Sequence, residues 1–271
     1  SLTTLQIQAF NPTVISNFTS LQIIVLTLSQ MISLTTQELY NLTSNQVNYI
    51  TTDELPFLNI SAFNPSSIIG LTSKEFAVLT TTQISLLTTT QVTKILPTQF
   101  NKLSTSQLRV LSASQIYALV DPSDIEAMTP GQIQALTTFQ VSKLLPISVS
   151  GFTINQISIL SPMQIMALTP SELININVTS ISYLLTSQVT SFTTDQISVL
   201  TTREISAFTS SQIQILLTTQ LGAISLIDIA NLLLIDVPIF LTTQIIALTT
   251  KQIGSLSQSQ INMLTPTQIL A

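Results

Sequence analysis

The amino-acid sequence predicts an all-α solenoid, a superhelix of very short capped helices with one helix in every eight residues. Three observations predict this fold: a repeat with a period of eight, a fixed order of residue types within the repeat, and prolines concentrated at one of its positions. The segment LTTTQISLLTTTQVTK (79–94) contains two copies of the repeat, head to tail. A unit this short cannot enclose a core alone, so neighbouring copies must stack.

The repeat extends over almost the whole chain. Its frame begins at Leu2, breaks at LNISA (58–62), resumes at residue 63 and contains one inserted residue, Val120. This gives 33 repeats, which we call octads and number 1 to 8, as in LTTTQISL (79–86). We therefore expect a single octad-repeat solenoid over residues 1–271, with irregularities at 58–62, 119–127 and 224–239.

Each preferred residue type has a role at the start of a short helix. Position 2 is Ser, Thr, Asn or Asp in 27 octads, and position 5 is Gln or Glu in 26. This spacing is that of the capping box, in which each side chain pairs with a free backbone N–H of the first turn. Nine of the eleven prolines occupy position 3, the first helical residue, where no N–H is needed. Positions 1 and 6 are apolar in all 33 octads, as the hydrophobic staple requires.

A β-solenoid is the alternative fold, because Thr, Ile and Val favour strands and stacked Gln side chains can form ladders. Positions 1 and 6 are an odd number of residues apart, so a continuous strand would place the two apolar rows on opposite faces. The chain also has only five glycines, too few to form a tight β turn in each of 33 octads. Both observations favour helices.

The composition argues against several classes of function. Only 7% of the residues are charged, and neither cysteine nor histidine occurs. The seven Lys and Arg are dispersed, so we expect no nucleic-acid partner. Thiol and imidazole catalysis and the usual zinc ligands are also missing. Eight of the twelve carboxylates stand at position 5, where helix capping explains them. We therefore expect no enzyme activity, no cofactor and no metal site.

The most apolar segment, residues 221–241, has the length of a membrane helix. It contains Asp228, Asn231, Asp236 and Pro238, and carboxylates at the centre of a bilayer are costly, so we expect no membrane span. The chain begins with Ser1 and without a basic start, which suggests a processed or excised segment. Neither end resembles a polar cap. Either the chain is part of a longer array, or further copies cover its ends head to tail.

The apolar octads at 224–239, together with leucines at position 2 elsewhere, predict a self-association surface, because exposed apolar surface usually marks a contact. Tolerated drift within a repeat is the alternative explanation. The candidate residues are Leu217, Ile227, Leu232, Leu233, Leu234, Ile235, Ile239 and Leu241. Four sequons permit N-glycosylation, at Asn17, Asn41, Asn59 and Asn177.

The phrases LTTKQIGSL, MTPGQIQAL, LTTFQVSKL and FTSSQIQIL resemble the LTTxQIxAL-type repeats of very large bacterial surface or secreted proteins of the adhesin-like kind. The resemblance covers nearly the whole chain and is weakest around 224–239. It implies an extracellular or cell-surface location, a structural or adhesive role and no catalytic residue.

From the octads and the resemblance together, we expect a structural protein that is a filament subunit or a segment of a long fibrous surface protein. Its expected partners are copies of itself or flanking repeats of the same chain. The alternative is an adhesive or ligand-binding module that presents rows of Thr to glycan or ice, although the prolines at position 3 interrupt such rows.

Overall fold

The computed structural model describes residues 2–271. These residues form α-helices and 3-10 helices of three to six residues, with no strand among them. The predicted all-α fold is confirmed, and the β-solenoid alternative is not supported. The chain divides into two compact units, one up to residue 148 and one from residue 149 onward. None of the helices in the described part of the chain is long and apolar enough to cross a bilayer.

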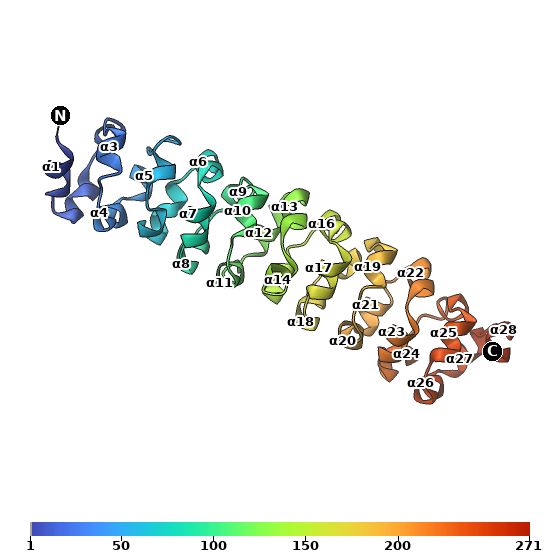
Figure 1. The fold of residues 1–271 in the computed structure, drawn as a ribbon. Helices are drawn as coiled ribbons and strands as arrows, with labels where there is room; N and C mark the ends of the chain where they lie inside the picture. Colours follow the sequence, from blue (N-terminus) through green and yellow to red (C-terminus); the bar gives the residue numbers. More distant parts are fainter. Residues whose placement is uncertain (1) are drawn as a thin grey trace. The chain divides into compact units, whose positions relative to one another are not determined.

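The α-helices, labelled as in Figure 1, are α1 Thr4–Gln8, α2 Ser20–Ile24, α3 Leu28–Met31, α4 Thr36–Asn41, α5 Ser44–Val47, α6 Ser73–Val78, α7 Thr81–Leu86, α8 Thr89–Val92, α9 Pro97–Phe100, α10 Thr105–Arg109, α11 Ala113–Tyr117, α12 Pro122–Glu126, α13 Pro130–Ala135, α14 Thr138–Val141, α15 Pro146–Val149, α16 Ile154–Ile159, α17 Pro162–Ala167, α18 Pro170–Leu173, α19 Thr186–Val189, α20 Thr194–Val199, α21 Thr202–Ile205, α22 Ser210–Ile215, α23 Thr218–Ala223, α24 Leu226–Ala230, α25 Thr242–Ala247, α26 Thr250–Ser255, α27 Gln258–Met263 and α28 Pro266–Leu270. The 3-10 helices are η1 Pro12–Asn17, η2 Leu55–Phe57, η3 Ile60–Ala62, η4 Pro65–Gly70, η5 Val178–Tyr183 and η6 Val237–Ile239.

The helices begin where the capping pattern predicts. Before α7, Oγ1 of Thr80 accepts a hydrogen bond from the backbone N–H of Gln83 at 3.1 Å, and Oε1 of Gln83 accepts one from the N–H of Thr80 at 2.8 Å. The same reciprocal pair starts α1, α2, α6 and α13. Pro130 is the first residue of α13, as predicted for position 3. Helices this short are not stable in isolation, so packing between octads must hold them.

Three octads form longer 3-10 helices in place of α-helices. Here Asn11, Asn64 or Asn177 precedes the helix, and its Oδ1 accepts from the backbone N–H two residues later. This Asx turn leads the chain into a tighter helix than the capping box does. All three octads lack Gln or Glu at position 5.

The two prolines outside position 3 also lie in 3-10 helices. Pro56 is in η2 and Pro238 is in η6, each at the second residue. A proline inside an α-helix removes a hydrogen bond and clashes with the preceding turn. The local change of helix type in octads 50–57 and 232–239 follows from this restriction.

The core of each unit is formed by positions 1 and 6. Side chains such as Phe63, Phe76 and Phe100 are at most 1% exposed. In each unit, helices three octads apart pack against each other, for example α7 with α10 and α20 with α23 (Figure 1). The octads therefore wind into superhelical turns whose apolar side chains stack from one turn to the next.

The irregular segments keep the core continuous. In LNISA (58–62), Leu58 is 4% exposed and Ile60 is 1% exposed, so five residues supply both apolar anchors of an octad. The inserted Val120 is 50% exposed, which places the extra residue outside the core. The next helix, α12, begins after Asp121, whose Oδ1 accepts from the N–H of Ser123. The octad frame thus continues past both irregularities; a single solenoid over the whole chain stays a prediction.

Candidate functional site

The glutamines at position 5 connect consecutive superhelical turns. Nε2 of Gln91 donates to the main-chain oxygens of Ile60 at 3.0 Å and Phe63 at 2.8 Å, while its Oε1 accepts from the N–H of Thr88 at 2.9 Å. One carboxamide therefore caps its own helix and binds the preceding turn. We call the glutamines that donate to both oxygens the glutamine ladder. It comprises Gln46, Gln83, Gln91, Gln107, Gln115, Gln132, Gln140, Gln188, Gln196, Gln212, Gln220, Gln244, Gln252, Gln260 and Gln268.

The ladder defines the length of a superhelical turn. Gln196 donates to Ile165 and Leu168, which precede it by 31 and 28 residues. Ile165 belongs to the fourth octad before that of Gln196 and Leu168 to the third, so one superhelical turn contains between three and four octads. No period of whole octads is therefore visible in the sequence. The separations become 28 and 25 for Gln83, across the shortened octad, and 32 and 29 for Gln132, across Val120. The ladder therefore follows octad position and not residue count.

The ladder glutamines are buried, so their hydrogen bonds matter to stability. Gln91 and Gln188 are 0% exposed and Gln220 is 1% exposed. A hydrogen bond contributes about 1 kcal/mol net, but leaving a buried polar group unpaired costs about 1–3 kcal/mol. Loss of a ladder donor therefore weakens the contact between two turns, although the position-6 oxygen keeps a backbone donor, as the oxygen of Ile60 does in the N–H of Phe63 at 3.1 Å.

Where position 5 is not glutamine, the hydrogen bonds of the ladder glutamines are replaced only in part. The hydroxyl of Ser67 donates to the main-chain oxygen of Leu42, and the hydroxyl of Ser148 donates to that of Leu119. Ser180 Oγ is buried and has no partner within residues 2–271. Glu38 retains the capping contact, because its Oε2 accepts from the N–H of Thr35 at 2.7 Å. Its Oε1 is buried without a partner in the described structure.

Aspartates at position 5 introduce titratable groups. Burial, together with the neighbouring Asp121 carboxylate, raises the pKa of Asp124 to about 6. Hydrogen bonds from the N–H and the hydroxyl of Ser123 lower the pKa of Asp121. Burial also raises the pKa of Asp236. Asp228 instead accepts from the Thr202 hydroxyl at 2.7 Å, which links it to α21.

Most residues of the predicted self-association surface are exposed. Ile227 is 71% exposed and Ile235 is 69% exposed. Leu217, Leu233, Leu234 and Leu241 are each 45–48% exposed, and Ile239 is half-buried. Leu232 lies in the core at 6% exposure, because it occupies position 1, and it is therefore removed from the predicted surface.

Two of these residues stand directly before neighbouring helices. Leu217 precedes α23 and Leu241 precedes α25, and these two helices pack against each other. At both positions the leucine N–H still donates to the position-5 glutamine, at 2.8 and 2.9 Å. Only the side-chain half of the cap is lost, which leaves the leucine side chain free to face solvent.

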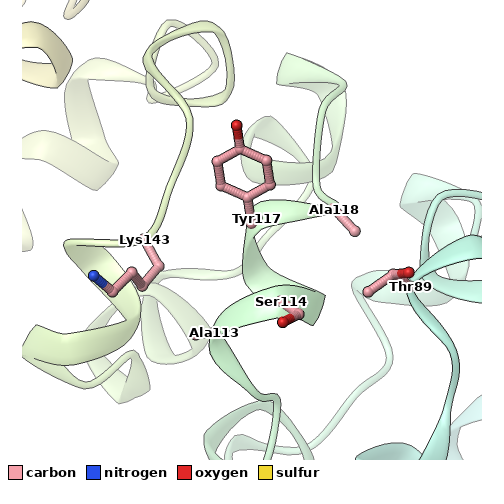
Figure 2. Close-up of a pocket in the computed structure, with 6 residues that line it drawn as sticks. All are labelled: Thr89, Ala113, Ser114, Tyr117, Ala118 and Lys143. Carbon is pink, nitrogen blue, oxygen red and sulfur yellow. The ribbon is translucent and has the colours of Figure 1, made fainter.

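The surface of the first unit carries a groove of about 430 Å³ (Figure 2). It is lined by Thr89, Ala113, Ser114, Tyr117, Ala118 and Lys143. In Figure 2 the hydroxyl of Tyr117 and the amine of Lys143 point apart. Nζ of Lys143 lies 5.3 Å from the ring centroid of Phe139. A small-molecule site needs polar groups that converge on the ligand, so this groove does not support a binding site.

The four predicted sequons differ in their surroundings. Asn17, Asn59 and Asn177 are exposed, whereas Asn41 is half-buried and its Nδ2 donates to the main-chain oxygen of Gln37 at 2.7 Å. A glycan on Asn41 would have to break that hydrogen bond. Glycosylation of the four residues stays a prediction.

The repeat pattern predicts the capping role of position 5 but does not by itself indicate the ladder. The overlooked signal is that position 5 holds 21 glutamines and five glutamates. Either residue completes a capping box, but only glutamine can donate to the preceding turn. The sequence matches no protein-family model and no curated protein. The geometry is therefore the basis for any functional proposal.

Proposed function

We propose that the chain is a structural repeat protein that self-associates outside the cell, as a filament subunit or as a segment of a long fibrous surface protein. The observation that supports this most strongly is the glutamine ladder. Each ladder carboxamide is fully engaged in holding its own helix and the preceding turn. Buried polar side chains whose hydrogen bonds are all made within the fold make it rigid, which suits a protein whose role is to keep a fixed shape.

Self-association has a candidate surface in the second unit. Ile227 lies in α24 and Ile235 lies in the segment between α24 and η6, and both expose more than two thirds of their area. Leu217 and Leu241, at the starts of the packed helices α23 and α25, add exposed apolar area. Exposed apolar groups of this size favour contact with another apolar surface, and a further copy of the chain offers the same groups. The resemblance to surface-protein repeats supports an extracellular setting.

Electron microscopy and analytical ultracentrifugation of the purified chain test this proposal. We expect ordered assemblies for the wild type and fewer for the double variant Ile227→Asp, Ile235→Asp. Leu86→Asp is the matched control, because Leu86 is 58% exposed but lies outside this surface. Monodisperse wild-type monomers at all concentrations would contradict the proposal.

A binding module for glycan or ice is the second candidate function. It is favoured by the exposed position-3 residues Thr81 and Thr105, which lie on the packed helices α7 and α10. The corresponding residue of α13 is Pro130, so the row of hydroxyls is interrupted. Inhibition of ice growth or retention on a glycan array by the monomeric chain would favour this function over the structural one.

A further inference from the structure

A second groove in the first unit, of about 530 Å³, lies beside the shortened octad at 58–62. In this octad Leu58 and Ile60 are the buried anchors of positions 1 and 6, so the residues of positions 3 to 5 are missing. In a complete octad those residues form the first turn of a helix, as they do in α7. Here the chain forms only the three-residue 3-10 helix η3, and the groove accompanies this change in the repeat.

The groove has an apolar and a polar part, which come from two packed parts of the chain. Helix α7 packs against η3, and residues from and beside both helices line the groove. The apolar part includes Phe57 and Leu86, which are 65% and 58% exposed. The polar part includes Asn59, Ser61 and Thr82. None of the lining residues is charged, so the groove is a neutral surface with both kinds of group.

Two polar groups of the lining residues are free to bind a ligand. Oδ1 of Asn59 accepts from the hydroxyl of Ser61 at 2.6 Å, which holds the amide in place. Nδ2 of Asn59 and Oγ1 of Thr82 have no hydrogen-bond partner within the part of the chain that the structure describes. The first supplies two N–H donors, and the second can donate or accept. Gln83 also lines the groove, but its amide is engaged in the glutamine ladder.

We propose that this groove binds a neutral saccharide. The face of an exposed aromatic ring packs against the C–H groups of a sugar ring, and the sugar hydroxyls need donors and acceptors beside that ring. Phe57 supplies the ring, and Asn59 and Thr82 supply the polar groups. A volume of 530 Å³ lies within the usual range of small-molecule sites. The inference goes beyond the proposed self-association, whose candidate residues all lie in the second unit.

The chemistry of the lining favours a neutral saccharide over other ligands. Phosphate, sulfate and carboxylate groups are held by Arg or Lys, and neither residue lines the groove. A wholly apolar ligand would cover Asn59 and Thr82 without pairing their polar groups, which is costly. Proline-rich peptides bind grooves lined by several aromatic side chains, whereas Phe57 is the single aromatic residue of this lining.

Retention on an array tests the class of ligand. The neutral probes are cellohexaose, maltohexaose and chitohexaose, and the contrasting probes are a heparin oligosaccharide and a proline-rich peptide. Asn59 is one of the predicted sequons, so the chain is produced in a host that lacks N-glycosylation, which keeps its amide free. We expect retention on at least one neutral probe and none on heparin or on the peptide.

Isothermal titration calorimetry with the retained neutral probe then tests the residues. Phe57→Ser removes the ring and should weaken binding about tenfold or more. Asn59→Ala should weaken it by a smaller factor, because the ring remains. Phe139→Ser is the matched control, since Phe139 is 59% exposed in α14 and does not line the groove, and its affinity should equal that of the wild type. Circular dichroism checks that each variant keeps its helices.

Several results overturn the saccharide site: no retention on any neutral probe, retention on heparin or the peptide alone, or an affinity of Phe57→Ser equal to that of the wild type or of Phe139→Ser. The variant Ile227→Asp, Ile235→Asp should bind the probe like the wild type, so the groove and the proposed self-association can fail separately. Thr105→Ala interrupts the row of position-3 hydroxyls. If that variant loses retention and Phe57→Ser does not, the second candidate function stands and the groove fails.

Discussion

Nε2 of Gln220 donates a 2.9 Å hydrogen bond to the main-chain oxygen of Phe192, one superhelical turn earlier in the chain. The same carboxamide accepts from the N–H of Leu217 at 2.8 Å. Position 2 is a leucine here and cannot cap the helix with its side chain, yet α23 still begins at Thr218. The half of the capping box that Gln220 supplies, together with its contact to the preceding turn, is therefore enough to start this helix.

Replacing a ladder glutamine by glutamate should be strongly destabilising. In Gln91→Glu, the carboxylate retains the hydrogen bond from Thr88 but places a negative oxygen against the main-chain oxygens of Ile60 and Phe63. We expect the free energy of unfolding to fall by about 3 kcal/mol, as for an uncompensated buried charge. Gln22→Glu is the matched control and should change it little, because Gln22 caps its helix but is exposed. Equal losses in urea unfolding of the two variants would contradict the ladder.

Glu38→Gln should be stabilising. Glu38 is 1% exposed, and its Oε1 is buried without a partner in the described structure. A glutamine amide in this place can donate to the main-chain oxygens of Ile7 and Phe10, the acceptors that the ladder register assigns to it. Thermal or urea unfolding should show a gain of about 1–2 kcal/mol. Glu54→Gln should give a smaller gain because Glu54 is half-buried; a loss of stability in Glu38→Gln would count against the register.

The stability should depend on pH through Asp124. Its pKa is about 6 in the folded chain and 3.8 for an ordinary aspartate. The folded state therefore binds more protons between pH 4 and pH 6, and the free energy of unfolding contributed by this group falls as pH rises through that range. Asp124→Asn should remove this part of the slope and should be the more stable protein at pH 7, by about 1 kcal/mol after solvent screening. Urea unfolding of both proteins at pH 4 and pH 7 measures the difference, and an unchanged slope would refute the assignment.

Gly70 should not tolerate a side chain. A Cβ atom built there would lie 2.0 Å from the main-chain oxygen of Ser44, so η4 or α5 would have to move. We expect Gly70→Ala to lower the free energy of unfolding by about 1–3 kcal/mol, the usual cost of overpacking. Gly222→Ala is the control, because it lies within α23 with no atom within 4 Å of the added carbon. This variant should be stabilised by about 0.4–1 kcal/mol, and calorimetry of the pair compares the two effects.

The sequence was sufficient to predict the short helices but not the superhelical turn into which they are arranged. Thr80 and Gln83 are three residues apart, so their capping contact is local and can be read from the repeat. The contact of Gln83 with Leu55 joins residues 28 apart, and nothing local specifies that distance. Its only trace is the preference for glutamine over glutamate at position 5.

The exposure of residues in the predicted self-association surface is also hard to predict from local sequence alone. Leu232 stands among apolar neighbours in the sequence, and local composition alone does not separate it from Leu233. The octad frame does separate them, because position 1 is buried at Leu232 while position 2 is exposed at Leu233. Exposure also depends on whether another turn covers a residue, which no single octad reveals: of two position-6 residues, Ile253 is 40% exposed and Leu221 is 0% exposed.

Hydrogen exchange of the glutamine side-chain amides, followed by NMR on protein labelled with nitrogen-15 at glutamine, tests the ladder most directly. We expect slow exchange for ladder residues such as Gln91, Gln188 and Gln220, and free-amide rates for Gln6 and Gln22 in the monomer. Exchange of Gln91, Gln188 and Gln220 at the same fast rate as Gln6 and Gln22 would contradict the central claim that these amides hold one superhelical turn on the next.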